Sequence, residues 1–129
     1  MKEKVLLVDD ERLVLDCFQR MLSNRFEIET ACGPEEALGA IASNGPFAVV
    51  LSDFRMPGLN GVELLQRIKT LNPSTVGILL SGNAEVARSM LADSTALFRV
   101  LDKPCPYTKL ISVLSDALAY YHQHVPGVS

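Results

Sequence analysis

The sequence of 129 residues has no tryptophan, three cysteines and no long apolar segment. Its longest apolar stretches, near residues 5–8 and 48–51, are far shorter than the roughly 20 residues of a membrane-spanning helix, and its first residues lack the layout of a signal peptide. Cys17, Cys32 and Cys105 match no disulfide or metal spacing. We expect a cytoplasmic protein without a membrane partner, with reduced thiols in or near its core.

Neither sign of charge is in large excess. Twelve lysine and arginine residues stand against fifteen aspartate and glutamate residues, which gives a formal net charge of −3, and the basic residues are scattered. Because nucleic acids are bound through clustered basic side chains, we expect no direct nucleic-acid partner. What is present is a balanced composition, 48% hydrophobic, with the length of one globular domain.

Apolar runs alternate along the chain with segments of helical periodicity. This alternation implies right-handed crossovers and a parallel sheet covered by helices on both faces. The predicted fold class is therefore α/β, doubly wound around five parallel strands. Residues 1–121 would form the domain, and residues 122–129 a tail or the start of a linker. The predicted strands are residues 5–8, 26–31, 47–51, 76–80 and 97–101, and the predicted helices are residues 11–24, 35–43, 62–71, 84–92 and 110–121.

Two of these segments have patterns that predict their surroundings. In residues 26–31, Phe26, Ile28 and Thr30 alternate with Glu27 and Glu29, which is typical of a strand with one wetter face near the edge of a sheet. In residues 11–24 the apolar side chains recur at the helical period and are expected to line one buried side. These side chains are Leu13, Val14, Cys17, Phe18, Met21 and Leu22.

Polar side chains follow four of the predicted strands. Asp9 and Asp10 follow the first strand, Asp53 follows the third, Ser81 the fourth and Lys103 the fifth. The carboxyl ends of the strands in an open parallel sheet meet at a crevice, which is the usual ligand site of such folds. We therefore expect these five residues, although distant in sequence, to be neighbours.

Three carboxylates in one crevice repel one another, so at least one becomes protonated unless a cation shares the site. Mg²⁺ prefers oxygen ligands and keeps waters that a phosphate oxygen can displace. Lys103 and Ser81 add a positive charge and a hydroxyl for an incoming anion. The set suits phosphoryl transfer, where positioning and charge neutralisation dominate catalysis, with Asp53 as the nucleophile that forms an acyl phosphate.

Four segments resemble the receiver domain of two-component response regulators. They are VLLVDD at residues 5–10, LSDFRMPGLNG at residues 51–61, LLSG at residues 79–82 and DKP at residues 102–104. Each segment is short, but the four stand in the family's order and the match spans nearly the whole chain. The resemblance implies a flavodoxin-like sheet with strand order 2-1-3-4-5 and a switch protein that catalyses only its own phosphorylation and dephosphorylation.

The resemblance also implies a metal site and a phosphoacceptor. Asp53 would accept the phosphoryl group. Asp10 and Asp53 would bind Mg²⁺ directly, and Asp9 would help, partly through water. The backbone carbonyl of Arg55 would complete the protein ligands of the ion.

Further roles follow from the same resemblance at the third and fourth matching segments. Ser81 would hydrogen-bond the phosphoryl group and move on activation, and Gly82 would keep the site open beside it. Lys103 would pair with the phosphoryl oxygens. The family has a cis peptide bond before the residue that corresponds to Pro104, a conformation mainly available to proline.

One position departs from the family pattern. The family usually has Tyr or Phe three residues before the lysine, where the ring swings inward as the hydroxyl residue moves, but this chain has Val100. Phe98 lies two positions earlier and is expected on the same face of the strand, because alternate residues share a face. Arg55 and Asn83 stand at the variable positions that would tune the lifetime of the phosphoryl group.

Partners follow from the resemblance as well. The phosphoryl donor would be a sensor histidine kinase or a phosphotransfer protein, and the response would pass through protein contacts to a downstream output domain or partner protein. A dimer through the face formed by residues 84–92, 97–101 and 110–121 is a further expectation.

Taken singly, these motifs also have structural interpretations. Asp10 can cap the first helix, Asp53 can begin a loop, and Ser81 can be an ordinary strand exit. Residues 56–58 and 60–61 are typical of turns that would shape the wall of the site. His122 and His124 have the spacing of a metal pair, but without a third ligand nearby we expect a solvated tail.

Two other functions use similar residues. A haloacid-dehalogenase-like phosphatase also combines an aspartate nucleophile, Mg²⁺, Ser or Thr and Lys, but its nucleophile follows the first strand and its acidic pair comes late. Here the acidic pair, Asp9 and Asp10, comes first. A pseudo-receiver would bind a partner without being phosphorylated, and Val100 gives that alternative some weight.

Overall fold

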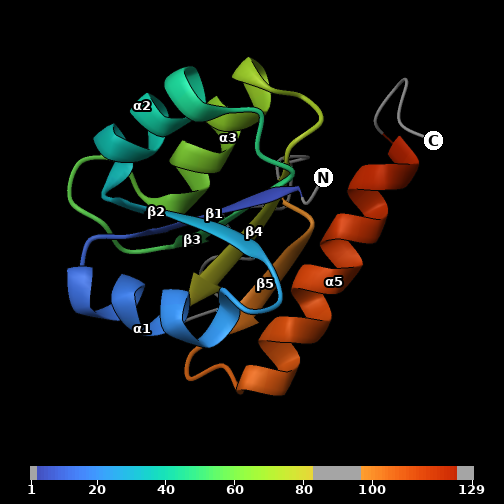
Figure 1. Cartoon of the computed structure of the whole chain (residues 1–129). Helices are drawn as coiled ribbons and strands as arrows, with labels where there is room; N and C mark the ends of the chain where they lie inside the picture. Colours follow the sequence, from blue (N-terminus) through green and yellow to red (C-terminus); the bar gives the residue numbers. More distant parts are fainter. Residues whose placement is uncertain (1–2, 83–96, 125–129) are drawn as a thin grey trace.

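The computed structural model describes residues 3–82 and 97–124, which form one parallel five-stranded sheet with helices on both faces (Figure 1). The strand order is β2-β1-β3-β4-β5, so the predicted α/β class and strand order are confirmed. The helix predicted over residues 84–92 lies outside the described residues. The strands are β1 (Lys4–Asp9), β2 (Glu27–Cys32), β3 (Val49–Asp53), β4 (Val76–Ser81) and β5 (Arg99–Asp102), and the helices are α1 (Arg12–Leu22), α2 (Pro34–Asn44), α3 (Gly61–Leu71) and α5 (Tyr107–His124).

The central strands β1, β3 and β4 are buried on both faces, as their unbroken apolar runs predict. Side chains alternate between two apolar layers because successive residues of a strand point to opposite faces. In β1, Val5 and Leu7 enter the layer beneath α1 and α5, whereas Leu6 and Val8 enter the layer beneath α2 and α3. The two layers are the core of the molecule.

The helices cover the sheet in two pairs (Figure 1). Leu15 and Leu22 of α1 share their layer with Leu110 and Leu114 of α5, while α2 and α3 share the other layer. No helix in the described part of the chain is both long and apolar enough to span a membrane. Helices therefore cover both faces of the sheet.

The buried side of α1 differs from the prediction. Leu15 and Leu22 are buried and Phe18 packs beside them, but Leu13 is 83% exposed and Cys17 is exposed. Helical residues three, four and seven positions apart share a side, whereas residues two apart do not. The stripe through residues 15, 18 and 22 excludes Leu13, so the predicted stripe was wrong at its first residue and at Cys17.

The edge strands and the ends of the elements add smaller corrections. β2 is an edge strand, as predicted. Phe98 lies just before β5, because that strand begins at Arg99 rather than at residue 97.

The last helix, α5, continues to His124. The His124 ring stacks on Tyr120 at 3.9 Å between centroids, and its Nδ1 lies 2.9 Å from the Tyr120 carbonyl. His122 pairs with Glu3 at 3.1 Å. Both histidines belong to α5, and both side chains are exposed, as expected. The division of the chain at residue 121 stays a prediction.

Candidate functional site

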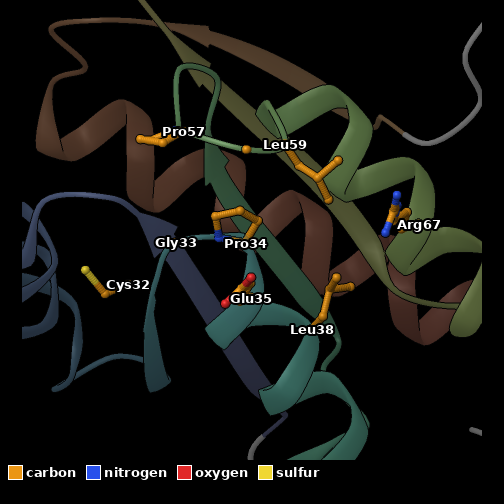
Figure 2. Close-up of a pocket in the computed structure, with 9 residues that line it drawn as sticks. Cys32, Gly33, Pro34, Glu35, Leu38, Pro57, Leu59 and Arg67 are labelled. Atoms are coloured by element: carbon orange, nitrogen blue, oxygen red, sulfur yellow. The ribbon is translucent and has the colours of Figure 1, made fainter.

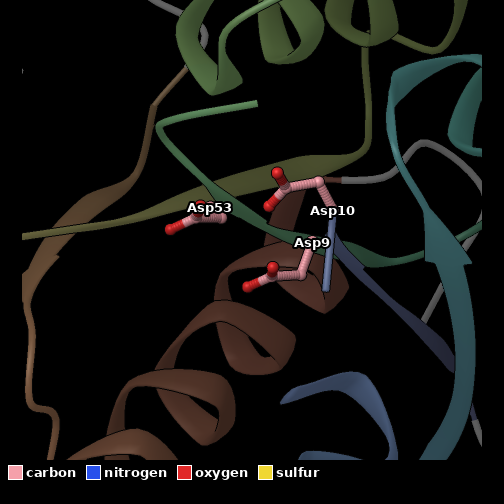
Figure 3. A group of neighbouring side chains, drawn as sticks. All are labelled: Asp9, Asp10 and Asp53. Atoms are coloured by element: carbon pink, nitrogen blue, oxygen red, sulfur yellow. The ribbon is translucent and has the colours of Figure 1, made fainter. Parts of the chain in front are cut away.

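Three aspartates gather at the carboxyl edge of the sheet. Asp9 ends β1, Asp10 follows it, and Asp53 ends β3. Figure 3 shows their carboxylates at this one edge, and a ligand oxygen from each lies within 4.8 Å of the others. Asp9 and Asp53 are buried while Asp10 is exposed. The predicted convergence of these three residues is confirmed.

Asp9 carries the electrostatic cost of this arrangement. Burial raises its pKa from 3.8 to about 6, and the nearby charge of Asp53 adds to the increase. The Glu11 amide donates a 2.9 Å hydrogen bond to Asp9 Oδ1, and this bond and the charge of Lys103 lower the pKa in part. Burial and the charge of Asp53 therefore disfavour the ionised form of Asp9, which a bound cation would stabilise.

Lys103 and Ser81 complete the predicted group of five. The Lys103 ammonium forms an ion pair with Asp53 Oδ1. Ser81 is buried at the end of β4, and its carbonyl accepts a 2.9 Å hydrogen bond from the Lys103 amide. This hydrogen bond fixes the backbone of Lys103 to β4, the strand that ends with Ser81.

The segment between β3 and α3 holds Asp53 in place. The Phe54 amide donates to the Leu80 carbonyl at 2.9 Å, and the Gly61 amide donates to the Phe54 carbonyl at 2.8 Å. Asn60 and Glu63 form a reciprocal capping box that starts α3. Both ends of this segment are thus tied to the sheet or to the helix.

Two glycines in this segment have different tasks. Gly58 has φ of +90°, as expected of a turn glycine. Gly61 has no such φ, but a Cβ there would lie 2.3 Å from the Asp53 carbonyl oxygen. The expectation of turn chemistry accounts for Gly58 but not for Gly61, whose missing side chain allows α3 to approach the backbone of Asp53.

The other predicted residues lie around this group. The expected cis peptide bond joins Lys103 and Pro104. Gly82 is exposed, and a Cβ there would meet nothing within 4 Å, while Asn83 lies outside the described residues. Asp10 and Arg55 share an open depression of about 480 Å³. Its lining is Asp10, Phe54, Arg55, Met56, Pro57 and Asn60.

Phe98 does not share the face of Val100, so that expectation was wrong. Val100 packs against the layer beneath α2 and α3, whereas Phe98 packs against the layer beneath α1 and α5. The Phe98 ring lies 5.1 Å from that of Tyr120, and the Arg99 guanidinium lies 4.3 Å from the Phe98 ring. Phe98 precedes the strand, so strict alternation does not apply to it.

Ser52 was missed by the sequence argument. It lies in β3 between the buried Leu51 and Asp53, is itself fully buried, and its hydroxyl donates a 2.9 Å hydrogen bond to the Asp53 carbonyl. A hydroxyl within an otherwise apolar strand was the available signal. The bond to the following carbonyl could not be inferred from sequence, because it depends on the rotamer of the serine.

A separate hollow of about 400 Å³ lies between the start of α2 and the segment before α3 (Figure 2). Pro34 and Leu38 line it from α2, and Leu59 and Arg67 line it from the other side. None of the three clustered aspartates is among its lining residues. The chemistry described above therefore concentrates at the carboxyl edge and not in this hollow.

Comparison with known proteins agrees with this geometry. The structure is similar to the signal receiver domain of an HD-domain-containing protein from Pseudomonas fluorescens Pf-5, with a TM-score of 0.89, 29% identity, and coverage of 96% of this chain and 100% of that chain. It is also similar to the response regulator protein TrrA from Thermotoga maritima, solved in complex with Mg(2+)-BeF, with a TM-score of 0.80, 29% identity, and coverage of 90% and 99%.

Sequence comparison gives the same result. The chain is 32% identical over 120 residues to the uncharacterized transcriptional regulatory protein YesN of Bacillus subtilis. The aligned region covers 90% of this chain and 32% of YesN. The chain thus spans less than a third of the length of that relative. Residues 5–115 match the sequence model of the response regulator receiver domain. This chain therefore belongs to the response regulator receiver domain family.

Proposed function

We propose that this chain is the phosphoryl-accepting switch of a two-component phosphorelay. Asp53 takes a phosphoryl group from a phosphohistidine of a sensor histidine kinase or a phosphotransfer protein, with Mg²⁺ as cofactor. The observation that carries this proposal is the meeting of three carboxylates and one ammonium where β1, β3 and β5 end. Few other tasks require so much charge at a partly buried edge.

The donor set of the edge fits Mg²⁺. Asp10 and Asp53 would hold the ion directly, Asp9 partly through water, and Arg55 through its backbone carbonyl. All of these donors are oxygens, which a hard divalent ion prefers, and ligand oxygens of Asp9, Asp10 and Asp53 lie within 4.8 Å of one another. When bound, the ion supplies charge that lets the carboxylates share one site and that neutralises the phosphoryl oxygens.

The residues of the chain then act by positioning. An Asp53 carboxylate oxygen attacks phosphorus, so that an oxygen–phosphorus bond forms while the nitrogen–phosphorus bond of the donor breaks and its electron pair returns to the imidazole. The Lys103 ammonium, already paired with Asp53, moves to a phosphoryl oxygen. The Ser81 hydroxyl donates a hydrogen bond to a second phosphoryl oxygen and moves as this bond forms. Burial of Asp53 limits the access of hydrolytic water.

The lifetime and the output of the switch depend on flanking residues and on other proteins. Gly82 leaves room beside the phosphoryl group, and Arg55 and Asn83 tune how fast water removes it. The response passes to an output domain or a partner protein, with dimerisation through the face of β5 and α5. YesN is called a transcriptional regulatory protein and is about three times as long as the match, which supports an output module carried elsewhere in a longer protein, in the cytoplasm.

Intact mass spectrometry after mixing the chain with Mg²⁺ and phosphoramidate tests the proposal. Phosphoramidate is a suitable donor because its nitrogen–phosphorus bond matches that of phosphohistidine. We expect one added phosphoryl group on the wild type and on the exposed-site control Asp116→Asn, and none on Asp53→Asn. Omission of Mg²⁺ should remove the added mass as well.

Other outcomes would identify the alternatives. A folded wild-type protein that gains no mass from phosphoramidate or from a purified kinase would be a pseudo-receiver. Sustained turnover of p-nitrophenyl phosphate, lost in Asp53→Asn, would indicate a phosphatase. Either result contradicts the proposed switch.

A further inference from the structure

We propose that Ser52 and Gly61 together clamp the backbone carbonyl of the phosphoacceptor, and that this clamp sets the position of Asp53 and of the metal-binding carbonyl two residues later. The inference rests on the proposed function for its consequence but not for its geometry. Ser52 and Gly61 are positioning residues, because neither contacts the phosphoryl group.

The clamp acts on one peptide plane, that between Asp53 and Phe54. On its amide side, Phe54 N–H donates to the Leu80 carbonyl at 2.9 Å. On its carbonyl side, the Ser52 hydroxyl donates to the Asp53 oxygen at 2.9 Å. Because a peptide unit is planar and rigid, fixing both its N–H and its C=O fixes the plane.

Gly61, the first residue of α3, limits the movement of the Asp53 carbonyl from the side of that helix. A Cβ at this position would lie 2.3 Å from the Asp53 oxygen and 3.1 Å from the Asp53 carbonyl carbon, both of them backbone atoms. The Gly61 amide is in turn bound to the Phe54 carbonyl at 2.8 Å. The first residue of α3 therefore touches the same oxygen that Ser52 holds, and the capping box of Asn60 and Glu63 secures the start of that helix.

Ser52 is otherwise unexplained by its surroundings. It is fully buried and stands in register with Val8 on one side and Leu79 on the other, both of them in the layer beneath α2 and α3. An alanine would fit such a layer without a hydroxyl to satisfy, and a buried hydroxyl is tolerated only when it is hydrogen-bonded. The hydrogen bond to the Asp53 carbonyl is therefore the interaction that accounts for a hydroxyl at this position.

The consequence for the site follows from the chain geometry. The strand register and the clamped plane fix both backbone torsions that flank the Asp53 Cα, so that only side-chain rotation is left to the carboxylate. The same plane leads directly into Phe54 and Arg55. Loss of the Ser52 hydroxyl should therefore displace both the Asp53 carboxylate and the Arg55 carbonyl, which are ligands of one ion in the proposed site.

Ser52→Ala and a matched control, Thr75→Val, test the clamp. Thr75 is also buried, and its hydroxyl also donates to a backbone carbonyl, that of Phe47 at 2.7 Å, but at the other end of the sheet. Each variant removes one buried hydroxyl bond. Calorimetric titration with Mg²⁺ should show affinity lowered roughly tenfold in Ser52→Ala, which is the usual effect of losing a group that orients metal ligands, and unchanged affinity in Thr75→Val. The rate of phosphorylation by phosphoramidate should follow the same pattern.

Hydrogen exchange gives a readout that needs neither metal nor phosphate. The Phe54 amide should exchange faster in Ser52→Ala than in Thr75→Val once both rates are corrected for global stability. Unchanged exchange at Phe54, or equal effects of the two variants on Mg²⁺ affinity, would overturn the clamp. Faster exchange at Phe54 in a protein that accepts no phosphate would keep the clamp and reject the proposed function, so the two failures are distinguishable.

Discussion

The two ends of the same sheet are built differently. At the amino end, the Thr75 hydroxyl donates to the Phe47 carbonyl, and the Lys4 ammonium lies 5.0 Å from the ring centre of the fully buried Phe47. At the carboxyl end, three carboxylates meet, and burial raises the pKa of Asp9 to about 6. These contacts at the amino end pair a hydroxyl with a carbonyl and a cation with an aromatic ring, whereas the carboxyl end gathers three carboxylates.

This difference separates stability from function within a single sheet. Every strand contributes to both ends of the sheet, so the two ends do not differ in secondary structure. They differ in the side chains that lie at the ends of the strands. Functional sites commonly accept a cost in stability of this kind. Substitutions at the amino end should therefore change the free energy of unfolding, whereas substitutions at the carboxyl end should change chemistry and, for Asp9, should even stabilise the protein.

The largest effect is expected from Phe47→Ala. Removal of this fully buried ring should lower the free energy of unfolding by roughly 3–5 kcal/mol, as measured by urea denaturation. The phosphorylation rate of the folded fraction should stay the same, because the ring is remote from Asp53. The milder Phe47→Leu keeps the test usable if the alanine variant does not fold. A large loss of rate in folded Phe47→Leu would contradict the separation of the two ends.

Lys103→Ala should act on chemistry instead. The Lys103 ammonium is the one cation paired with Asp53 among the described residues, and removing a donor to the transferred group typically slows a reaction by roughly 100-fold. Mg²⁺ binding should persist, because the carboxylates remain. NMR shift mapping should also detect a smaller structural response per phosphorylated molecule. Lys109→Ala, an exposed lysine of α5, is the control, and an equal slowing in it would argue against the role of Lys103.

Asp9→Asn should stabilise the metal-free protein at neutral pH. The folded pKa of about 6 exceeds the unfolded value near 3.8, so the favourable contribution of Asp9 is complete below pH 3.8 and is lost as the pH rises through 6. The asparagine variant avoids this loss and should gain roughly 2–3 kcal/mol at pH 7 but almost nothing at pH 4. Its amide oxygen can still accept from the Glu11 amide.

Urea denaturation of both proteins across this pH range measures the difference. Added Mg²⁺ should stabilise the wild type more than Asp9→Asn. A difference that is the same at pH 4 and pH 7 would show that Asp9 does not carry the electrostatic cost. Asp116→Asn, at an exposed site on α5, should change stability by less than about 0.5 kcal/mol at either pH.

The smallest effect is expected from Phe98→Leu. Loss of its ring contact with Tyr120, 5.1 Å away, should cost about 1 kcal/mol and leave the phosphorylation-dependent NMR shifts around Val100 unchanged. Phe98 faces the layer of α5, so it is not placed to replace the missing ring at Val100. If the variant loses those shifts, Phe98 takes part in switching after all.

Much of the fold could be predicted because apolar periodicity reports burial directly. The unbroken runs in β1, β3 and β4 predicted buried parallel strands, and the alternation in β2 predicted an edge strand. The predictions were wrong where more than one way of packing a helix or strand fits the apolar pattern of its sequence. α1 has apolar side chains on more than one side, and only its packing on the sheet selects Leu15 over Leu13.

The candidate site was predicted to a similar extent. Asp9, Asp10, Asp53, Ser81 and Lys103 were found because a residue that follows a parallel strand must lie at the carboxyl edge, whatever the details of packing. Ser52 was missed because its hydrogen bond depends on the rotamer of the serine, and the close approach of Gly61 was missed because it depends on the distance between α3 and the end of β3. The face of Phe98 was wrong, since β5 begins one residue after it.

The sequence by itself determined the fold class, the acidic, hydroxyl and lysine side chains that gather at one edge, and the end of the sheet at which they meet, because strand direction and residue order are properties of the chain. Only the tertiary structure decided which atoms of those residues meet. It put the Lys103 ammonium on Asp53, buried Asp9 beside it, and brought α3 against the Asp53 carbonyl. Such contacts depend on distances of a few tenths of an ångström between elements far apart in sequence, and only the packing of the whole domain sets them.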